Sequence, residues 1–264
     1  MNLSEVNVLA QLGSAMKNSL AVMRRHFATL WSATAWPYMV MIICFLIARF
    51  VVNADHDPSK QWDPVTLWHS MGVPAKLGLL LAYLACISFP NGFATAGATV
   101  VIWADLQGEE VDLQSVFLRI GQVFLRLTGL SLCIGIMCSI GGAFLYLPGV
   151  LVFAFMSFTI PVLVIEDAKV LTALRRGINL ASMRFGTLLG LYAVVLLVLV
   201  ATAIGVVFVA PIADLKGWTG IIAFWALIVA ILPILMMVTT AVVVHLYRDL
   251  REQRGELAAR NPAA

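Results

Sequence analysis

Residues 159–189, TIPVLVIEDAKVLTALRRGINLASMRFGTLL, contain in one stretch the unit that decides the fold. An apolar run ends at Ile165, the acids Glu166 and Asp167 follow, and another apolar run opens at Phe185. Long apolar runs indicate membrane spans, and the charged residues between them indicate a return to the aqueous boundary. The stretch therefore predicts the end of one span, a polar turn, an intervening helix and the start of a second span.

The intervening residues 170–184 predict an amphipathic basic helix, because their apolar side chains recur at alternating three- and four-residue steps and so share one face. That face carries Leu171, Leu174, Ile178, Ala181 and Phe185, and the other carries Arg175, Arg176, Asn179 and Ser182. Such a helix is most stable lying flat in the membrane interface, with apolar side chains in the acyl region and arginines among lipid phosphates. We call a basic interfacial helix of this kind an elbow.

The composition is that of a polytopic membrane protein. Of 264 residues, 61% are hydrophobic and only 12% charged, whereas soluble domains carry about 25% charged residues. A net charge of +3 gives no indication of a nucleic-acid partner. The four cysteines lie inside apolar runs without CxxC or Cys/His spacing, so they are interpreted as packing residues, and neither a metal site nor a cofactor is predicted.

Six apolar runs predict an all-α fold with six transmembrane helices in a single integral membrane domain, residues 1–256, followed by a disordered tail at 257–264. The runs lie at about 28–52, 76–103, 127–145, from Pro148-Gly149 to 165, 185–209 and 219–246. A cleaved signal peptide is the alternative for the first run, but that run exceeds the roughly 7 to 15 apolar residues of a signal. The second run contains SFPNG at 88–92, which predicts a kinked or unwound helix.

Two further segments, LGSAMKNSLAVMRRHF before the first span and residues 113–126 before the third, have the pattern of an elbow. With these assignments, most of the 17 lysines and arginines fall on one side of the membrane. They are Lys17, Arg24 and Arg25; Arg119 and Arg126; Lys169, Arg175, Arg176 and Arg184; and Arg248, Arg251, Arg254 and Arg260. The positive-inside rule then places both termini in the cytoplasm of a bacterial inner-membrane protein.

The elbows indicate an internal repeat. The first aligns with the third without a gap at an offset of 158 positions, which places Lys17 on Arg175. The middle elbow fits with a two-residue deletion, pairing Arg119 with Arg175 and Arg126 with Arg184. We hypothesise three copies of an elbow plus a transmembrane hairpin, at about 9–104, 113–166 and 169–247, around an axis along the membrane normal. The alternative is that any basic amphipathic entry to a span gives this pattern.

Residues 160–192, IPVLVIEDAKVLTALRRGINLASMRFGTLLGLY, resemble the membrane domain fused to some bacterial glycerophosphodiester phosphodiesterases and the related stand-alone uncharacterised membrane proteins. The features that carry the resemblance are Pro161, Glu166, the ALRR block at 173–176, Asn179-Leu180, Phe185, the LLG at 188–190 and the LYRDLR at 246–251. It covers roughly the second half of the chain, and it departs at Gly177-Ile178, where that family has a serine and an aromatic residue. The resemblance implies six spans and a membrane role. It does not imply phosphodiesterase activity, which belongs to a separate soluble domain for which this chain is too short.

The sequence offers no catalytic constellation. Its four histidines, His26, His56, His69 and His245, lie in four different segments, and HExxH, Walker-type and GxSxG motifs do not occur. Intramembrane catalysis would need paired acids within the spans, and no span carries an acid at a central position. We therefore predict no catalytic residues, and an intramembrane enzyme is the third and last hypothesis.

Two sets of candidate binding residues remain. The cavity set would line a ligand site, because polar side chains and broken helices mark substrate sites in membranes. It consists of Ser88, Pro90, Asn91, Gly92, Thr95 and Thr99, with Thr239 and Thr240 in the sixth span as further candidates. Packing between helices is the alternative role for such residues. The headgroup set would bind lipid phosphates, or would only set the topology: Lys17, Arg24, Arg25, Arg119, Arg126, Arg175, Arg176 and Arg184.

The leading hypothesis is a non-enzymatic inner-membrane protein that binds or moves a lipid or other amphiphile. Its elbows would bind headgroups, and a cavity near residues 90–92 would hold part of the ligand. The competing hypothesis is a structural scaffold or partner subunit for a soluble enzyme or transporter. The expected partners are membrane lipids and, under the competing hypothesis, another protein, but no nucleic acid.

Overall fold

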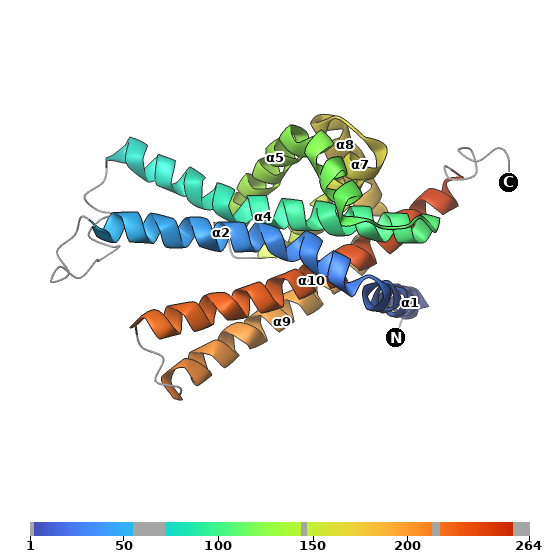
Figure 1. The fold of residues 1–264 in the computed structure, drawn as a ribbon. Coiled ribbons are helices and arrows are strands. Elements are labelled where there is room, and N and C mark those ends of the chain that lie inside the picture. Colours follow the sequence, from blue (N-terminus) through green and yellow to red (C-terminus); the bar gives the residue numbers. More distant parts are fainter. Residues whose placement is uncertain (1–2, 55–71, 144–146, 213–216, 256–264) are drawn as a thin grey trace.

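The computed structural model of the chain describes residues 3–54, 72–143, 147–212 and 217–255, and within these it leaves out the side chains of residues 73–87 and 203–229, among others (Figure 1). Every described element is an α-helix, so the predicted all-α class is confirmed. The helices are α1 (Leu3–Arg25), α2 (Phe27–Ala54), α4 (Val73–Gln107), α5 (Leu113–Ala143), α6 (Leu147–Met156), α7 (Thr159–Glu166), α8 (Val170–Met183), α9 (Phe185–Ile212) and α10 (Gly217–Gln253).

Within the described residues, five segments are long and apolar enough to cross a membrane. They are Phe27–Cys44, Leu113–Cys138, Gly149–Glu166, Phe185–Thr202 and Ala230–Gln253. The chain is therefore a multi-pass membrane protein, as predicted. The predicted second span lies in α4, but the side chains of its residues 76–87 are outside the described part, and a sixth crossing stays a prediction. The predicted disordered tail, 257–264, also lies outside the described residues.

Two predicted spans that contain a proline, the second and the fourth, differ from the prediction in where their helices continue or break. Residues 88–92 do not unwind, because α4 stays helical through Pro90; a proline removes a single backbone hydrogen bond, and packed neighbours compensate for that loss in membrane helices. The fourth span, predicted as one helix, is instead divided into α6 and α7 by a turn at Ser157 and Phe158. Pro161 has no N–H to donate to the Ser157 carbonyl, so one helical bond is lost where the chain turns.

The middle elbow also differs from expectation. Residues 113–126 are not a separate helix but the first half of α5, which continues into the third span. Figure 1 shows α5 changing direction along its length. Within α5 the Thr128 hydroxyl donates to the Phe124 carbonyl at 2.9 Å, and Gly129 follows; such back-bonding bends a helix without ending it.

The core lies where the hairpins meet. α4 is central, since it packs against α2, α5, α7 and α10. The largest fully buried side chains come from all parts of the chain and include Leu30, Phe93, Leu127, Leu163, Leu188 and Tyr247. Because lipid is as apolar as these residues, close packing rather than the hydrophobic effect must hold the spans together.

Candidate functional site

The first and third elbows are separate helices that end just before a span. α1 ends at Arg25 and α2 begins at Phe27, whereas α8 ends at Met183 and α9 begins at Phe185. The residues at the two junctions are therefore His26 and Arg184, which the offset of 158 places on each other. Figure 1 shows α1 turned sharply away from the direction of α2.

The elbows bury equivalent faces. Ala15, Ser19 and Val22 of α1 are buried, and the offset of 158 places them on Ala173, Gly177 and Leu180, which are three of the four buried positions of α8. In the first half of α5 the buried positions with the same spacing are Val116, Ile120 and Val123. The middle elbow thus fits the burial pattern without the two-residue deletion that the cations suggested.

The predicted apolar faces of the elbows are exposed only in part. The exposed large apolar side chains include Met16 and Leu20 in α1, Phe117 and Phe124 in α5, and Leu171 in α8, of which Leu171 is 78% exposed. For α8 the predicted lipid-facing side is largely wrong, because Leu174, Ile178 and Phe185 pack against the core and Ala181 is buried. Met23 in α1 and Ile120 in α5 are buried as well. Each elbow therefore has one side packed on the bundle and another that presents large apolar groups to its surroundings.

Gly177 allows α8 to lie directly on α7. A Cβ atom at this position would lie 2.8 Å from both the backbone nitrogen and the Cα of Thr159, so the two helices could not stay as close. We expect Gly177→Ala to lower the free energy of unfolding by about 1–3 kcal/mol through overpacking. The measurement is the apparent melting temperature in detergent. Gly186→Ala, where a Cβ meets nothing within 4 Å, is the control, and an equal loss in both variants would contradict the prediction.

Each elbow-to-span junction bonds to the polar residue at the end of its own hairpin. His26 Nε2 lies 2.8 Å from Asp105 Oδ1, beyond the buried part of α4. Arg126 donates to Asp167 Oδ1 at 2.7 Å, and Arg184 donates to Gln253 Oε1 at 3.1 Å. We call these three pairs the junction contacts. They bring the elbows to one end of the bundle.

The predicted headgroup set divides into two groups. Arg25, Arg119, Arg126, Arg176 and Arg184 all contact protein acceptors. For example, Arg119 donates to the Val164 carbonyl at 2.8 Å, which satisfies a carbonyl at the C-terminus of α7. Lys17, Arg24 and Arg175 are exposed, and within the described part of the chain none of them forms an ion pair. Within the predicted headgroup set, as far as the structure describes the chain, these three can bind an external anion without giving up a protein contact.

A polar cluster joins α7, α8 and α10. The Tyr247 hydroxyl donates to one carboxylate oxygen of Glu166, and Arg176 Nε lies 3.0 Å from the other. Arg251, 6% exposed, lies 5.8 Å from the ring centres of both Trp103 and Tyr247. No sequence pattern predicts that Arg251 is buried, since it lies in a charged segment that is typical of a solvated helix.

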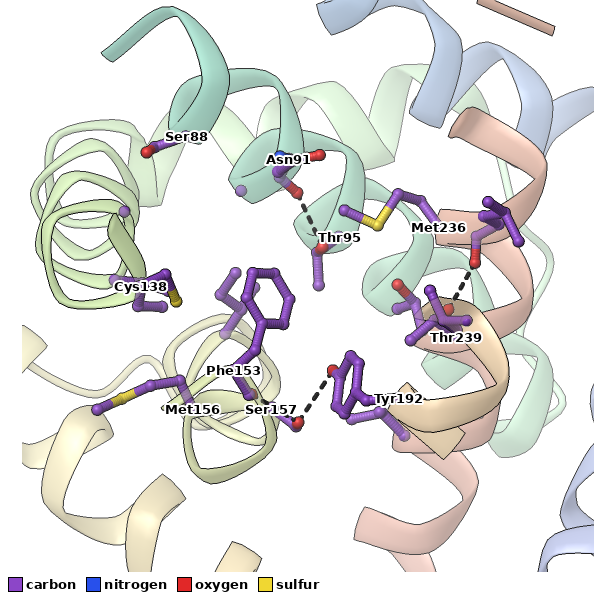
Figure 2. A pocket seen from close by; sticks show the side chains of 18 of the residues that line it. Ser88, Asn91, Thr95, Cys138, Phe153, Met156, Ser157, Tyr192, Met236 and Thr239 are labelled. Carbon is purple, nitrogen blue, oxygen red and sulfur yellow. Dashed lines mark hydrogen bonds between the residues drawn. The ribbon is translucent and has the colours of Figure 1, made fainter. Parts of the chain in front are cut away.

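A cavity of about 530 Å³ lies among α4, α5, α6, α9 and α10 (Figure 2). The structure brings four residues of the cavity set to its wall, Ser88, Asn91, Gly92 and Thr95, together with Thr239 and Thr240 from α10. Pro90 and Thr99 are buried but do not line it. Sequence reasoning missed Ser131, Cys138, Ser157 and Tyr192. Ser157 could have been found from Pro161, whose missing N–H places a turn there; the others carry no local signal.

The wall of the cavity is mostly apolar, and several of its hydroxyl groups already form hydrogen bonds within the protein. No described lining residue is charged. Thr95 donates to the Asn91 carbonyl at 2.8 Å and Thr239 donates to the Leu235 carbonyl at 2.7 Å, so these hydroxyls are satisfied within their own helices. Figure 2 shows Ser157 and Tyr192 turned toward each other, with their oxygens 2.9 Å apart. The cavity can therefore surround an apolar group better than a polar solute.

The described residues contain no cluster of histidine, cysteine, aspartate or glutamate that could hold a metal ion. Comparisons with protein-family models, curated proteins and solved structures find no match for this chain. The class that the fold and the site define is a multi-pass helical membrane protein with an internal, uncharged cavity.

Proposed function

We propose that this protein is a non-enzymatic bacterial inner-membrane protein that binds or moves a lipid or other amphiphile. The observation that carries the proposal is the combination of a cavity inside the bundle, with no charged residue among its described lining, and elbows that present exposed apolar side chains and exposed cations at one end of it. An amphiphile has matching parts, an apolar chain and a charged head. A scaffold or partner subunit would need no internal cavity, which favours lipid binding over that alternative.

We propose further that the chain is a threefold repeat of an elbow plus a transmembrane hairpin. Three features support this: the buried positions of the elbows agree, His26 and Arg184 are equivalent junction residues, and each repeat has a junction contact to the end of its own hairpin. The unbroken α5 is the departure from the pattern. The resemblance to the phosphodiesterase membrane domain also stays a proposal. It rests on the residues of the second half of the chain.

The proposed topology has six crossings with both termini in the cytoplasm. α1 packs against α10, and Gln253 near the end of α10 bonds to Arg184 beside the third elbow, so the first and last helices meet at the elbow end. Two chain ends on one side of a membrane require an even number of crossings. The excess of lysine and arginine at this end supports its assignment to the cytoplasm.

The test replaces the three available cations together, Lys17→Gln, Arg24→Gln and Arg175→Gln. We expect binding of phosphatidylglycerol to weaken about a hundredfold, because each of the three cations contributes on the order of 1 kcal/mol near an anionic surface and every 1.4 kcal/mol is a factor of ten in affinity. Native mass spectrometry of the detergent-solubilised protein, titrated with phosphatidylglycerol and with phosphatidylcholine, measures it.

The matched control is Arg248→Gln, which removes a cation that is already paired with Glu252 at 2.6 Å. It should leave phosphatidylglycerol binding within about twofold of the original. If the triple variant bound phosphatidylglycerol as tightly as the unmodified protein, the assignment of the elbows to headgroups would be wrong.

A further inference from the structure

We propose that the cavity takes one acyl chain of a membrane phospholipid, and that the chain enters sideways from the hydrocarbon core between α6 and α9. This inference rests on the proposed function, and it names the ligand and its route. It is carried by cavity-lining residues that are also partly exposed: Phe153 on α6 is 36% exposed, and Leu196 and Leu199 on α9 are each 37% exposed. At this seam the cavity wall borders the exposed face of α9.

The depth of the opening places it in the hydrocarbon core. With a rise of 1.5 Å per residue, Leu196 and Leu199 lie roughly 17 and 21 Å along α9 from its start at Phe185. A hydrocarbon core is about 30 Å thick, so these residues lie near its middle. Leu197, between them, is 69% exposed and belongs to the outer, lipid-facing side of α9. The group nearest to the opening is therefore a lipid chain, not water.

The wall favours a chain over a polar solute. A polar solute would exchange its bonds to water for bonds to the wall, and the loss of an uncompensated hydrogen bond costs about 1–3 kcal/mol. The Thr95 and Thr239 hydroxyl protons are already donated to backbone carbonyls, and Ser157 lies within hydrogen-bond distance of the Ala154 carbonyl and of Tyr192. The rest of the wall is mostly apolar surface from Ile134, Val150, Leu232 and their neighbours. Its other polar residues are Ser88, Asn91, Ser131 and Thr240.

The head of the lipid would stay outside, at the elbow. α6 and α9 are joined at the cytoplasmic edge of the opening by the Ser157–Tyr192 hydrogen bond and by the Phe153 and Tyr192 rings, whose centres are 5.5 Å apart (Figure 2). The elbow α8 packs against α6 and leads into α9, so it lies at the cytoplasmic end of both helices that flank the opening. Its exposed Arg175 offers a charge that is complementary to a phosphate.

The experiment uses the full chain in proteoliposomes that contain a phospholipid with a photoreactive diazirine in the middle of one acyl chain. After irradiation, peptide mapping locates the labelled residues. The expected result is labelling inside the cavity, at Thr95 or Met236, as well as on the outer surface of α9 at Leu197. Labelling of the outer surface alone would overturn the proposal. This test uses the unmodified protein.

Variants at the opening test the route. Leu196→Trp combined with Leu199→Trp fills the seam, and cavity labelling should fall about fivefold while labelling of the outer surface is unchanged. Leu197→Trp adds the same ring on the lipid side and should leave cavity labelling as it was. If the double variant does not elute as a folded monodisperse species, Leu196→Trp alone replaces it. Undiminished cavity labelling in a folded seam variant would show that the chain enters elsewhere and overturn the route.

The result is distinguishable from a failure of the proposed function. Phosphatidylglycerol binding by the triple variant at Lys17, Arg24 and Arg175 tests the elbows. The photolabel tests the cavity. If phosphatidylglycerol binding depends on the elbows but no label enters the cavity, the proposed function stands and the acyl-chain assignment fails. If neither effect is seen, both fail.

Discussion

Glu166→Ala should lower the free energy of unfolding by about 3 kcal/mol, because removing one partner of a half-buried ion pair leaves the other partners without their acceptor. Tyr247, which is fully buried, loses the carboxylate that accepts its hydroxyl proton, and Arg176 loses its counter-ion at 3.0 Å. At about 2–4 °C for each kcal/mol, the apparent melting temperature in detergent should fall by about 6–12 °C.

The matched control is Glu252→Ala. Glu252 also pairs with an arginine, Arg248 at 2.6 Å, but both side chains are more than 40% exposed and the pair lies within one helix. Such pairs contribute only about 0.3–0.5 kcal/mol, so the melting temperature should fall by no more than about 2 °C. Equal losses in the two variants would show that the Glu166 cluster does not hold α7, α8 and α10 together.

Gly97→Val should destabilise the protein by about 3 kcal/mol or more. A Cβ atom at this position would lie 2.9 Å from the backbone carbonyl oxygen of Ala33 and 3.1 Å from its Cβ. The obstacle is backbone, which cannot rotate away as a side chain can, so α2 and α4 would have to separate along their contact. Small residues at such crossings allow membrane helices to approach closely, and overpacking removes that contact.

The comparison is Gly121→Val, where an added Cβ meets nothing within 4 Å. That substitution should be neutral or slightly stabilising, since valine has a higher helix propensity than glycine. The measurement for both variants is the denaturation midpoint in mixed detergent micelles. A Gly97 variant as stable as the Gly121 variant would contradict the close approach of α2 and α4.

The membrane class and the elbows could be predicted because their signals are local. Hydropathy needs a window of a single helix, and the apolar steps around Leu171 and Leu174 need two turns. Single hydrogen bonds to the backbone decide whether a helix turns, as it does at Ser157, or continues, as it does in α5. A periodicity pattern does not resolve these, which is why the fourth span is divided and the middle elbow is not a separate helix.

The candidate sites were predictable in part for a similar reason. Polar residues within apolar spans stand out, so Asn91, Thr95 and Thr239 could be selected from sequence before their positions were known. Tyr192 reaches the cavity only through the packing of α9 on α6, which no local pattern encodes. The headgroup set has the same limit, because an arginine that satisfies a helix carbonyl, as Arg119 does, has the same local signature as one that faces lipid.

The junction contacts also bear on the order of events during synthesis. Their partners are 79, 41 and 69 residues apart in the chain, and each pair lies within one hairpin. Asp105 is translated before α5 begins, and Asp167 before α8 begins, so every pair is complete before the following elbow leaves the ribosome. The two segments that each contact joins can therefore lock together as they leave the insertion machinery, without waiting for the rest of the chain.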